Sequence, residues 1–202
     1  MLVRRLQQGL SIIEILVTLA IIGMLMALAG PSAGVWIQNT QLRNAAESVV
    51  SGLQQAKLEA LKRNKLVMFR LTDPGSTEWD ICLYDFTTDA CSTAPGAVLF
   101  SKSKNEASYN ARVGALINTV PAPLVPIAVG TGISSGNPAT FTFDPFGRQA
   151  ATAANNITQI DVRNTTLSLA NERRLVILVN AAGQIRMCDP KLSKATNPQG
   201  CV

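Results

Sequence analysis

The sequence predicts an α+β fold, in which one long N-terminal helix is followed by a head of mainly antiparallel strands. Residues 10–29 are almost wholly apolar, and apolar residues then recur at spacings of three and four along residues 42–60. After Asn64 the pattern changes to short apolar stretches separated by turns rich in proline and glycine. Helical periodicity at the start of the chain and strand patterns in the rest together indicate this fold class.

The apolar run at residues 10–29 has the length of a membrane-spanning helix. At about 1.5 Å per residue, about 20 residues give a helix of about 30 Å. Arg4 and Arg5 precede the run, which places the leader in the cytoplasm and the later residues across the membrane. The run contains one acid, Glu14, and a charge at the centre of a membrane helix costs about 2.5–3.5 kcal/mol. Glu14 is therefore a candidate functional residue, although its place near the start of the run also fits the membrane interface.

The second half of the predicted helix, residues 31–64, is amphipathic. Gly30, Pro31 and Gly34 separate it from the apolar run and predict a bend or local melting there. Its apolar residues form one stripe, which we expect to pack on a sheet: Leu42, Ala46, Val49, Leu53, Ala56 and Ala60.

The remaining chain, residues 65–202, has the pattern of a strand-rich head. A long stretch without any charged residue, 113–143, contains many prolines and glycines, so we expect mostly loop with short extended pieces, which packs on a sheet or on a neighbouring subunit. The turn sequences Asp73-Pro74-Gly75, Asp144-Pro145-Phe146-Gly147 and Ala182-Gly183 separate strands. We expect strands at residues 66–71, 79–86, 98–101, 139–143, 159–163, 174–180 and 184–188.

The chain has four cysteines, all beyond the apolar run, where disulfides can form. The short separations favour the pairs Cys82–Cys91 and Cys188–Cys201, while a bridge between Cys82 and Cys188 remains open. A zinc site is the competing interpretation, but the chain has no histidine and no CxxC pair. We therefore expect no metal and no cofactor.

The arrangement Gly9-Leu10-Ser11-Ile12-Ile13-Glu14 resembles the prepilin leader of type IV pilins and type II secretion pseudopilins. The resemblance implies that a prepilin peptidase removes residues 1–9 by cutting between Gly9 and Leu10, and that the new amine of Leu10 is methylated. It also implies that Glu14 serves filament assembly by pairing with the amine of Leu10 in an adjacent subunit. Leu10 departs from the more usual phenylalanine.

This resemblance also implies a course for the whole protein. The segment 10–30 would first anchor the chain in the inner membrane with a periplasmic head, and would then join the helical core of a pilus or pseudopilus. The expected partners are other pilins or pseudopilins, the prepilin peptidase and the membrane.

The C-terminal strands are similar to the end of a FimT/GspH-type domain. The similar segments are residues 173–180 and 183–190, together with the turn 143–148 that precedes them. FimT-like minor pilins carry a Gly-Arg-x-Arg tail motif implicated in binding DNA during natural transformation. In this chain Gly183 and Arg186 match the motif, while Gln184 replaces its first arginine.

Two functions follow from these resemblances, and both are non-enzymatic. The first is a minor type IV pilin that binds double-stranded DNA for uptake; its expected contacts are Arg186, Lys191, Lys194, Gln184, Arg173, Arg174 and Arg148. The alternative is a GspH-like pseudopilin or priming minor pilin with a structural role in secretion or pilus assembly. The net charge of +5, which becomes +3 without Arg4 and Arg5, is compatible with a polyanion partner. The absence of histidine disfavours catalysis.

Overall fold

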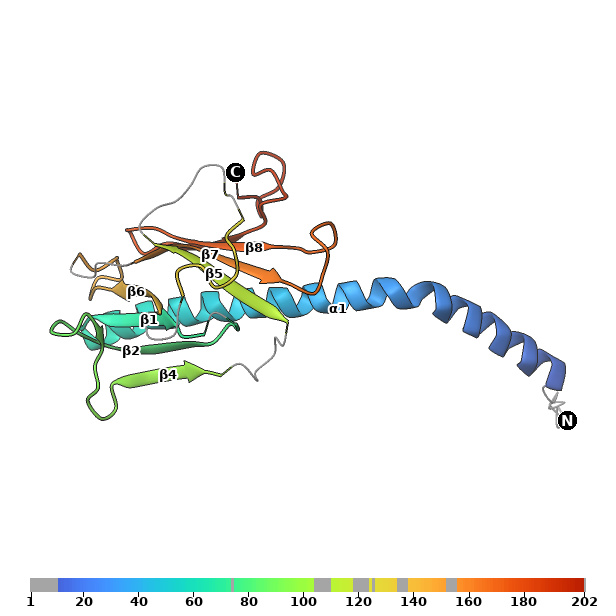
Figure 1. Cartoon of the computed structure of the whole chain (residues 1–202), viewed down its shortest axis with the longest axis horizontal. Coiled ribbons are helices and arrows are strands. Elements are labelled where there is room, and N and C mark those ends of the chain that lie inside the picture. The colour runs from blue at the N-terminus through green and yellow to red at the C-terminus, as the bar shows by residue number, and fades with distance from the viewer. Residues whose placement is uncertain are drawn as a thin grey trace, which may run out of the picture. The chain divides into compact units, whose positions relative to one another are not determined.

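The computed structural model describes residues 11–73, 75–103, 110–117, 124, 126–133, 138–151 and 156–201, with only the backbone of residues 28–32. The described residues form one helix, α1 (Ile12–Arg63), and nine strands. By its internal contacts the chain divides into two units between Ile37 and Gln38. The second unit is the strand-rich head, which also contains the C-terminal half of α1 (Figure 1).

The first sheet of the head is five-stranded, with the order β3-β2-β1-β6 and β4 paired to β2. Every pairing in it is antiparallel, and β1 lies between β2 and β6, because Val67 is opposite both Leu83 and Phe143. Its strands are β1 (Val67–Leu71), β2 (Trp79–Asp85), β3 (Ala90–Cys91), β4 (Val98–Lys102) and β6 (Ala139–Phe143).

The second sheet is four-stranded and also antiparallel, with the order β5-β7-β8-β9. A bridge between Thr140 and Asn156 joins the ends of the two sheets. Its strands are β5 (Ala111–Ile117), β7 (Ile157–Asn164), β8 (Leu175–Val179) and β9 (Ile185–Cys188).

The core of the head lies where the second half of α1 meets both sheets, which stand on either side of it (Figure 1). The predicted stripe from Leu42 to Ala60 is fully buried there, against Phe69 of β1 and Ile160 of β7 among others. Gly52 is required at this contact, since a Cβ there would lie 2.9 Å from the rings of Phe69 and Trp79. The predicted packing of this half-helix on a sheet is confirmed.

The strand predictions are largely confirmed, with two corrections. β5 occupies residues 111–117, where the sequence predicted no separate strand and, from residue 113 on, mostly loop with short extended pieces; β3 is an additional short strand. Gly114 explains the first error: its missing Cβ lets the backbone of Ala128 approach β5, so this glycine marks close packing within a strand. The backbone at residues 126–133 pairs with that edge, Gly130 N–H donating to Val113 and Ala115 N–H donating to Thr131, at 2.8 and 2.9 Å.

The helix α1 is continuous through Gly30, Pro31 and Gly34, so the predicted local melting is not found. Leu10 and the side chains of residues 28–32 are not among the parts of the chain that the structure describes. Within the described residues, no helix is long and apolar enough to cross a membrane, so the span predicted over residues 10–30 is not confirmed.

Candidate functional site

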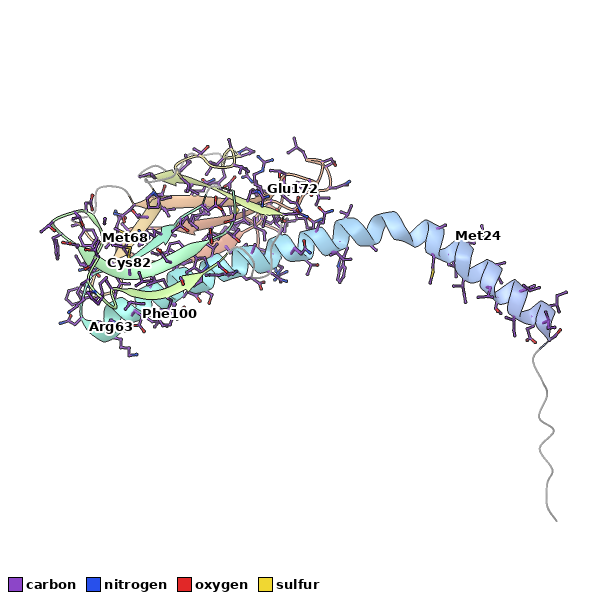
Figure 2. The ribbon with its side chains drawn as sticks, turned by 60° about the horizontal axis from the view of Figure 1, so that its bottom comes forward. Met24, Arg63, Met68, Cys82, Phe100 and Glu172 are labelled. Atoms are coloured by element: carbon purple, nitrogen blue, oxygen red, sulfur yellow. A yellow bond between two sulfur atoms is a disulfide. The ribbon has the colours of Figure 1, made fainter. Side chains whose placement is uncertain are left out.

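The N-terminal motif is only partly within the described residues. Gly9 and Leu10 lie outside them, whereas Glu14 lies in the first turn of α1 and its backbone N–H donates to Ser11 O at 3.0 Å. Glu14 is exposed, as are the apolar side chains of residues 12–26, and Met24 projects freely from the helix in Figure 2. A helix that is apolar around most of its surface needs lipid or other helices to cover it.

The C-terminal tail, residues 189–201, is folded against β9 and is ordered by several bonds. The predicted disulfide Cys188–Cys201 closes the tail into a loop, with 5.0 Å between the two Cα atoms. Arg186 donates from Nη2 to the carbonyl of Gly200 at 2.5 Å. The other predicted disulfide, Cys82–Cys91, is also present and ties β2 to β3.

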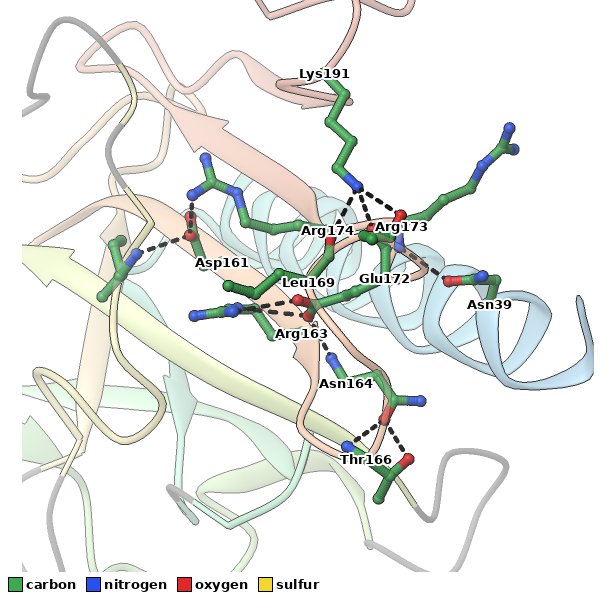
Figure 3. Close-up of polar contacts among 12 residues, drawn as sticks. Asn39, Asp161, Arg163, Asn164, Thr166, Leu169, Glu172, Arg173, Arg174 and Lys191 are labelled. Atoms are coloured by element: carbon green, nitrogen blue, oxygen red, sulfur yellow. Dashed lines mark hydrogen bonds and ion pairs between the residues drawn. The ribbon is translucent and has the colours of Figure 1, made fainter. Parts of the chain in front are cut away.

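Lys191 attaches this tail to the loop between β7 and β8. Its Nζ donates to the carbonyls of Leu169 and Glu172 at 3.1 and 2.8 Å (Figure 3). Carbonyl oxygens carry no net charge, so these hydrogen bonds fix the position of Lys191 Nζ without pairing it with an anion.

The same loop is held from its other side by α1. Asn39 donates from its amide to Asn171 O and accepts the backbone N–H of Arg173, both at 2.9 Å. The side chain of Arg173 extends away from this network (Figure 3) and is exposed, as is Lys194 in the tail. Arg173 and Lys194 are thus exposed cations of the predicted set, as are Lys191 and Arg148.

Arg174, predicted as a DNA contact, is instead buried with a side-chain exposure of 8%, against 0% for its partner Asp161. The two form an ion pair at 3.1 Å, and Arg174 also donates to the carbonyl of Leu124 at 2.9 Å. Ile127 N–H donates to Asp161 at 3.0 Å, so this pair fastens the uncharged segment to the sheet. Burial raises the pKa of Asp161, although hydrogen bonds and the charge of Arg174 oppose the shift.

Gln184 and Arg148 lie at the opposite end of the β8–β9 hairpin from Lys191. Gln184 accepts a hydrogen bond from Asn180 at 2.9 Å, and Arg148 pairs with Asp144 at 3.2 Å. The two turns touch closely, because a Cβ on Gly183 would overlap the carbonyl of the turn that contains Arg148. Since strands rise about 3.4 Å per residue, about 10 Å separates the two ends of the paired segment. The predicted contacts therefore do not form one cluster.

Sequence reasoning did not foresee the tethering role of Lys191 or the ion pair between Arg163 and Glu172, which lies at 3.1 Å. Among the described residues, the side chains of Asp80, Cys82 and Cys91 come closest to the arrangement of a metal-binding site. Those cysteines are bonded to each other, so they offer no thiolate ligands.

A long helix that begins as an exposed apolar segment with one acid, and ends packed on antiparallel sheets, defines the pilin-like class of filament subunits. Comparison with known families agrees. The model of the family described as "Type II transport protein GspH" matches residues 45–183, and the chain belongs to this family. The prokaryotic N-terminal methylation motif matches residues 4–30.

Similar solved structures include two crystal forms of the type IV minor pilin FimU from Pseudomonas aeruginosa, each 17% identical to this chain. Their TM-scores are 0.46 and 0.44; the matches cover 83% and 79% of this chain and 99% of each FimU chain. Comparison with curated proteins gives no match.

Proposed function

We propose that the protein is a minor type IV pilin of the FimT kind, which is incorporated in a pilus and binds double-stranded DNA for uptake. Membership of the GspH family and the methylation motif support the filament part of this proposal. In this proposal, the chain is first anchored in the inner membrane with its head in the periplasm. It is then cut between Gly9 and Leu10 and methylated on Leu10. Finally, it assembles with other pilins through its apolar helix and Glu14.

The distribution of charge carries the DNA part of the proposal. Residues 10–156 contain ten basic and ten acidic residues, whereas residues 157–202 contain six basic and three acidic ones. The net charge of +3 that remains without the leader therefore belongs entirely to residues 157–202, which comprise β7, the β7–β8 loop, the β8–β9 hairpin and the tail. Localised positive charge is the expected electrostatic signature of a polyanion-binding surface.

The structure refines which residues present that charge. The ion pairs Arg174–Asp161 and Arg163–Glu172 each neutralise one cation with one anion. The remaining charges are Asp189 and four cations: Arg173, Arg186, Lys191 and Lys194. Because the tail is already ordered by a disulfide and by Lys191, binding requires little further ordering.

Binding of duplex DNA should be measured with the full chain in nonionic detergent, by fluorescence anisotropy at several salt concentrations. Four phosphate contacts predict a slope of log K against log salt of about −3.6, a loss of about 100-fold between 50 and 200 mM. Arg173→Glu with Lys194→Glu should remove more than half of this slope. The matched control, Arg43→Glu with Lys65→Glu, makes the same charge change outside residues 157–202 and should leave the salt slope unchanged. Absence of salt-sensitive binding would refute the DNA function.

A structural role, as a GspH-like pseudopilin or priming minor pilin, is the second candidate. Two observations favour it: Gln184 replaces an arginine of the tail motif, and Arg174 is committed to a buried ion pair. Under this alternative, deleting the gene blocks secretion or piliation, and the double change at Arg173 and Lys194 has no effect on either.

A further inference from the structure

The loop between β7 and β8, residues 165–173, is bound to the first residues of the head. Gln38 Oε1 accepts hydrogen bonds from Asn164 Nδ2 and Thr166 Oγ1 at 3.1 and 2.6 Å. Asn39 makes the two hydrogen bonds to this loop described above (Figure 3). Because the second unit of the chain begins at Gln38, this loop lies at the end of the head where α1 enters it. We refer to residues 165–173 as the entry loop.

The other end of the head lies at the C-terminal end of α1. Lys57 donates from Nζ to Gly183 O, in the β8–β9 turn, at 2.9 Å. Asn39 and Lys57 are 18 positions apart, which is about 27 Å along a helix. The chain from the entry loop through β8 therefore runs along α1, and the two ends of the head are well separated.

The entry loop exposes an apolar side chain beside cations. Leu169 is 72% exposed. Arg173 is also exposed, and the ammonium group of Lys191 is fixed against the loop by backbone carbonyls. Lys194 follows three positions later in the tail and is exposed as well. An apolar residue among cations is the composition of a surface that binds a membrane of anionic lipids.

The acids of this part of the chain do not offset that charge at the surface. Residues 157–202 contain three acids: Asp161, Glu172 and Asp189. The first two are buried and paired with arginines. Asp189 is half-buried and accepts the backbone N–H of Lys191 at 2.8 Å. The surface that includes the entry loop therefore presents net positive charge.

The entry loop is also close, along the chain, to the proposed membrane anchor. Residues 10–30 end eight positions before Gln38, and α1 is continuous between them. Eight helical positions rise about 12 Å, and any tilt of the helix in the membrane shortens this height. The headgroup layer on each side of a bilayer is about 5–8 Å thick, so Gln38 stands at most about 7 Å beyond it. This height is within the Debye length of about 8 Å at physiological salt, so the charges of the entry loop and of the lipids attract each other.

We propose that the entry loop docks on anionic phospholipids of the membrane that holds the chain, before the chain joins a filament. Leu169 enters the boundary between headgroups and acyl chains, Arg173 and Lys194 lie against lipid phosphates, and Lys191 adds its charge. Charge complementarity and the short connection to the anchor select a lipid surface as the partner. This inference rests on the membrane anchoring in the proposed function and is independent of DNA binding.

Tryptophan fluorescence of the full chain in lipid nanodiscs tests the docking. The probe is Leu169→Trp in a Trp36→Phe background, and the quencher is acrylamide, because it is neutral and is not repelled by anionic lipid. Quenching should be at least about threefold weaker in discs of phosphatidylglycerol and phosphatidylcholine than in discs of phosphatidylcholine alone. Trp79 is present in every sample and is buried, so it contributes little to the difference.

A second probe position controls for general effects of the lipid. Phe86→Trp, in the same background, replaces a side chain that is 66% exposed in the β2–β3 turn. Leu83 of β2 is opposite Val67, and β1 begins shortly after α1 ends, so Phe86 lies at the end of the head away from the entry loop. Quenching of this probe should be the same in both kinds of disc.

Charge reversal tests the cause of the protection. Each cation near an anionic surface contributes about fivefold to binding, so Arg173→Glu with Lys194→Glu should raise quenching of the Leu169→Trp probe to the level in neutral discs. Lys62→Glu with Lys65→Glu, exposed positions near the end of α1, is the matched control and should preserve the lipid dependence. Salt at about 1 M should abolish the protection without any charge substitution.

The outcomes separate the docking from the anchoring. A chain that does not co-elute with the discs overturns both. A chain that co-elutes overturns the docking alone if the Leu169→Trp probe is quenched equally in both lipids, if the Phe86→Trp probe is protected to the same extent, or if the protection survives high salt.

Discussion

Replacing Arg174 with methionine tests whether this arginine is an internal structural residue or a DNA contact. The change preserves much of the side-chain volume and removes the charge that faces Asp161, whose side chain is completely buried. Two hydrogen bonds remain on the Asp161 carboxylate, from Ile127 N–H and from the Gln159 amide at 3.0 and 2.7 Å. Leaving a buried charge without its partner costs about 3–5 kcal/mol.

The loss of unfolding free energy has an upper limit, because Asp161 can take up a proton instead of remaining charged. With an unfolded pKa of about 3.9, protonation at pH 7 costs about 4.2 kcal/mol, and at pH 5 only about 1.5 kcal/mol. The folded variant then holds a proton that the unfolded chain lacks, so its stability falls as the pH rises. Burial already raises the pKa of Asp161 in the wild-type protein, and the loss of Arg174 extends the same trend to higher pH.

Urea unfolding followed by the fluorescence of Trp79, which is buried and donates to Ser48 Oγ at 3.2 Å, measures this effect. Arg174→Met should lose about 3–4 kcal/mol of unfolding free energy at pH 7 and recover about 2–3 kcal/mol of it at pH 5. Adding Asp161→Asn should restore most of the loss at pH 7. If Arg174→Met keeps wild-type stability but loses DNA binding, the assignment of Arg174 as a structural residue is refuted.

Four further changes have defined outcomes. Glu14→Val should leave cleavage intact but reduce incorporation into filaments, as seen in immunoblots of sheared filaments; normal incorporation would exclude the pairing with a neighbouring amine. Gly9→Val should block processing, and the longer precursor should be visible by mass spectrometry. Gly183→Ala should destabilise the head by several kcal/mol in urea unfolding, because φ is +71° and a Cβ overlaps the facing turn. Cys188→Ser with Cys201→Ser should release the tail, lowering the unfolding free energy by about 2–4 kcal/mol and speeding proteolysis after residue 188; an equally resistant tail would show that other bonds suffice to hold it.

Local patterns in the sequence predicted most of the fold. The stripe on α1, the strand boundaries and both disulfides depend on periodicity or short separation, which the sequence displays directly. β5 was missed because its signal depends on a partner distant in the chain: Gly114 is small to admit the backbone of Ala128. Sequence-local reasoning interprets such a glycine as a loop residue.

The site was harder to predict because Arg173 and Arg174 are adjacent and chemically identical. Arg173 is exposed, whereas Arg174 is buried and donates to the carbonyl of Leu124. Leu124 belongs to the segment 113–143, which the sequence predicted to be mostly loop. The period-two pattern of a strand does offer a signal, since it places Arg174 on the same face as Val176, which is fully buried. To use that signal, one must know that the face of the sheet with Arg174 and Val176 is covered by another segment of the chain.

If the tail binds DNA as proposed, the way in which it is held limits the kind of recognition it can perform. Arg186 and Lys191 each donate hydrogen bonds to carbonyl oxygens of the protein. Their contribution to DNA binding is therefore mainly charge, and less hydrogen bonding in a defined direction. Reading bases requires side chains that donate to base edges in a defined geometry, whereas phosphates respond to charge alone. A tail of this design should bind duplexes of different sequence with similar affinity and similar salt slopes. A strong preference for one sequence would mean that Arg173 or Gln184 reads bases directly, and that the tethered cations are secondary.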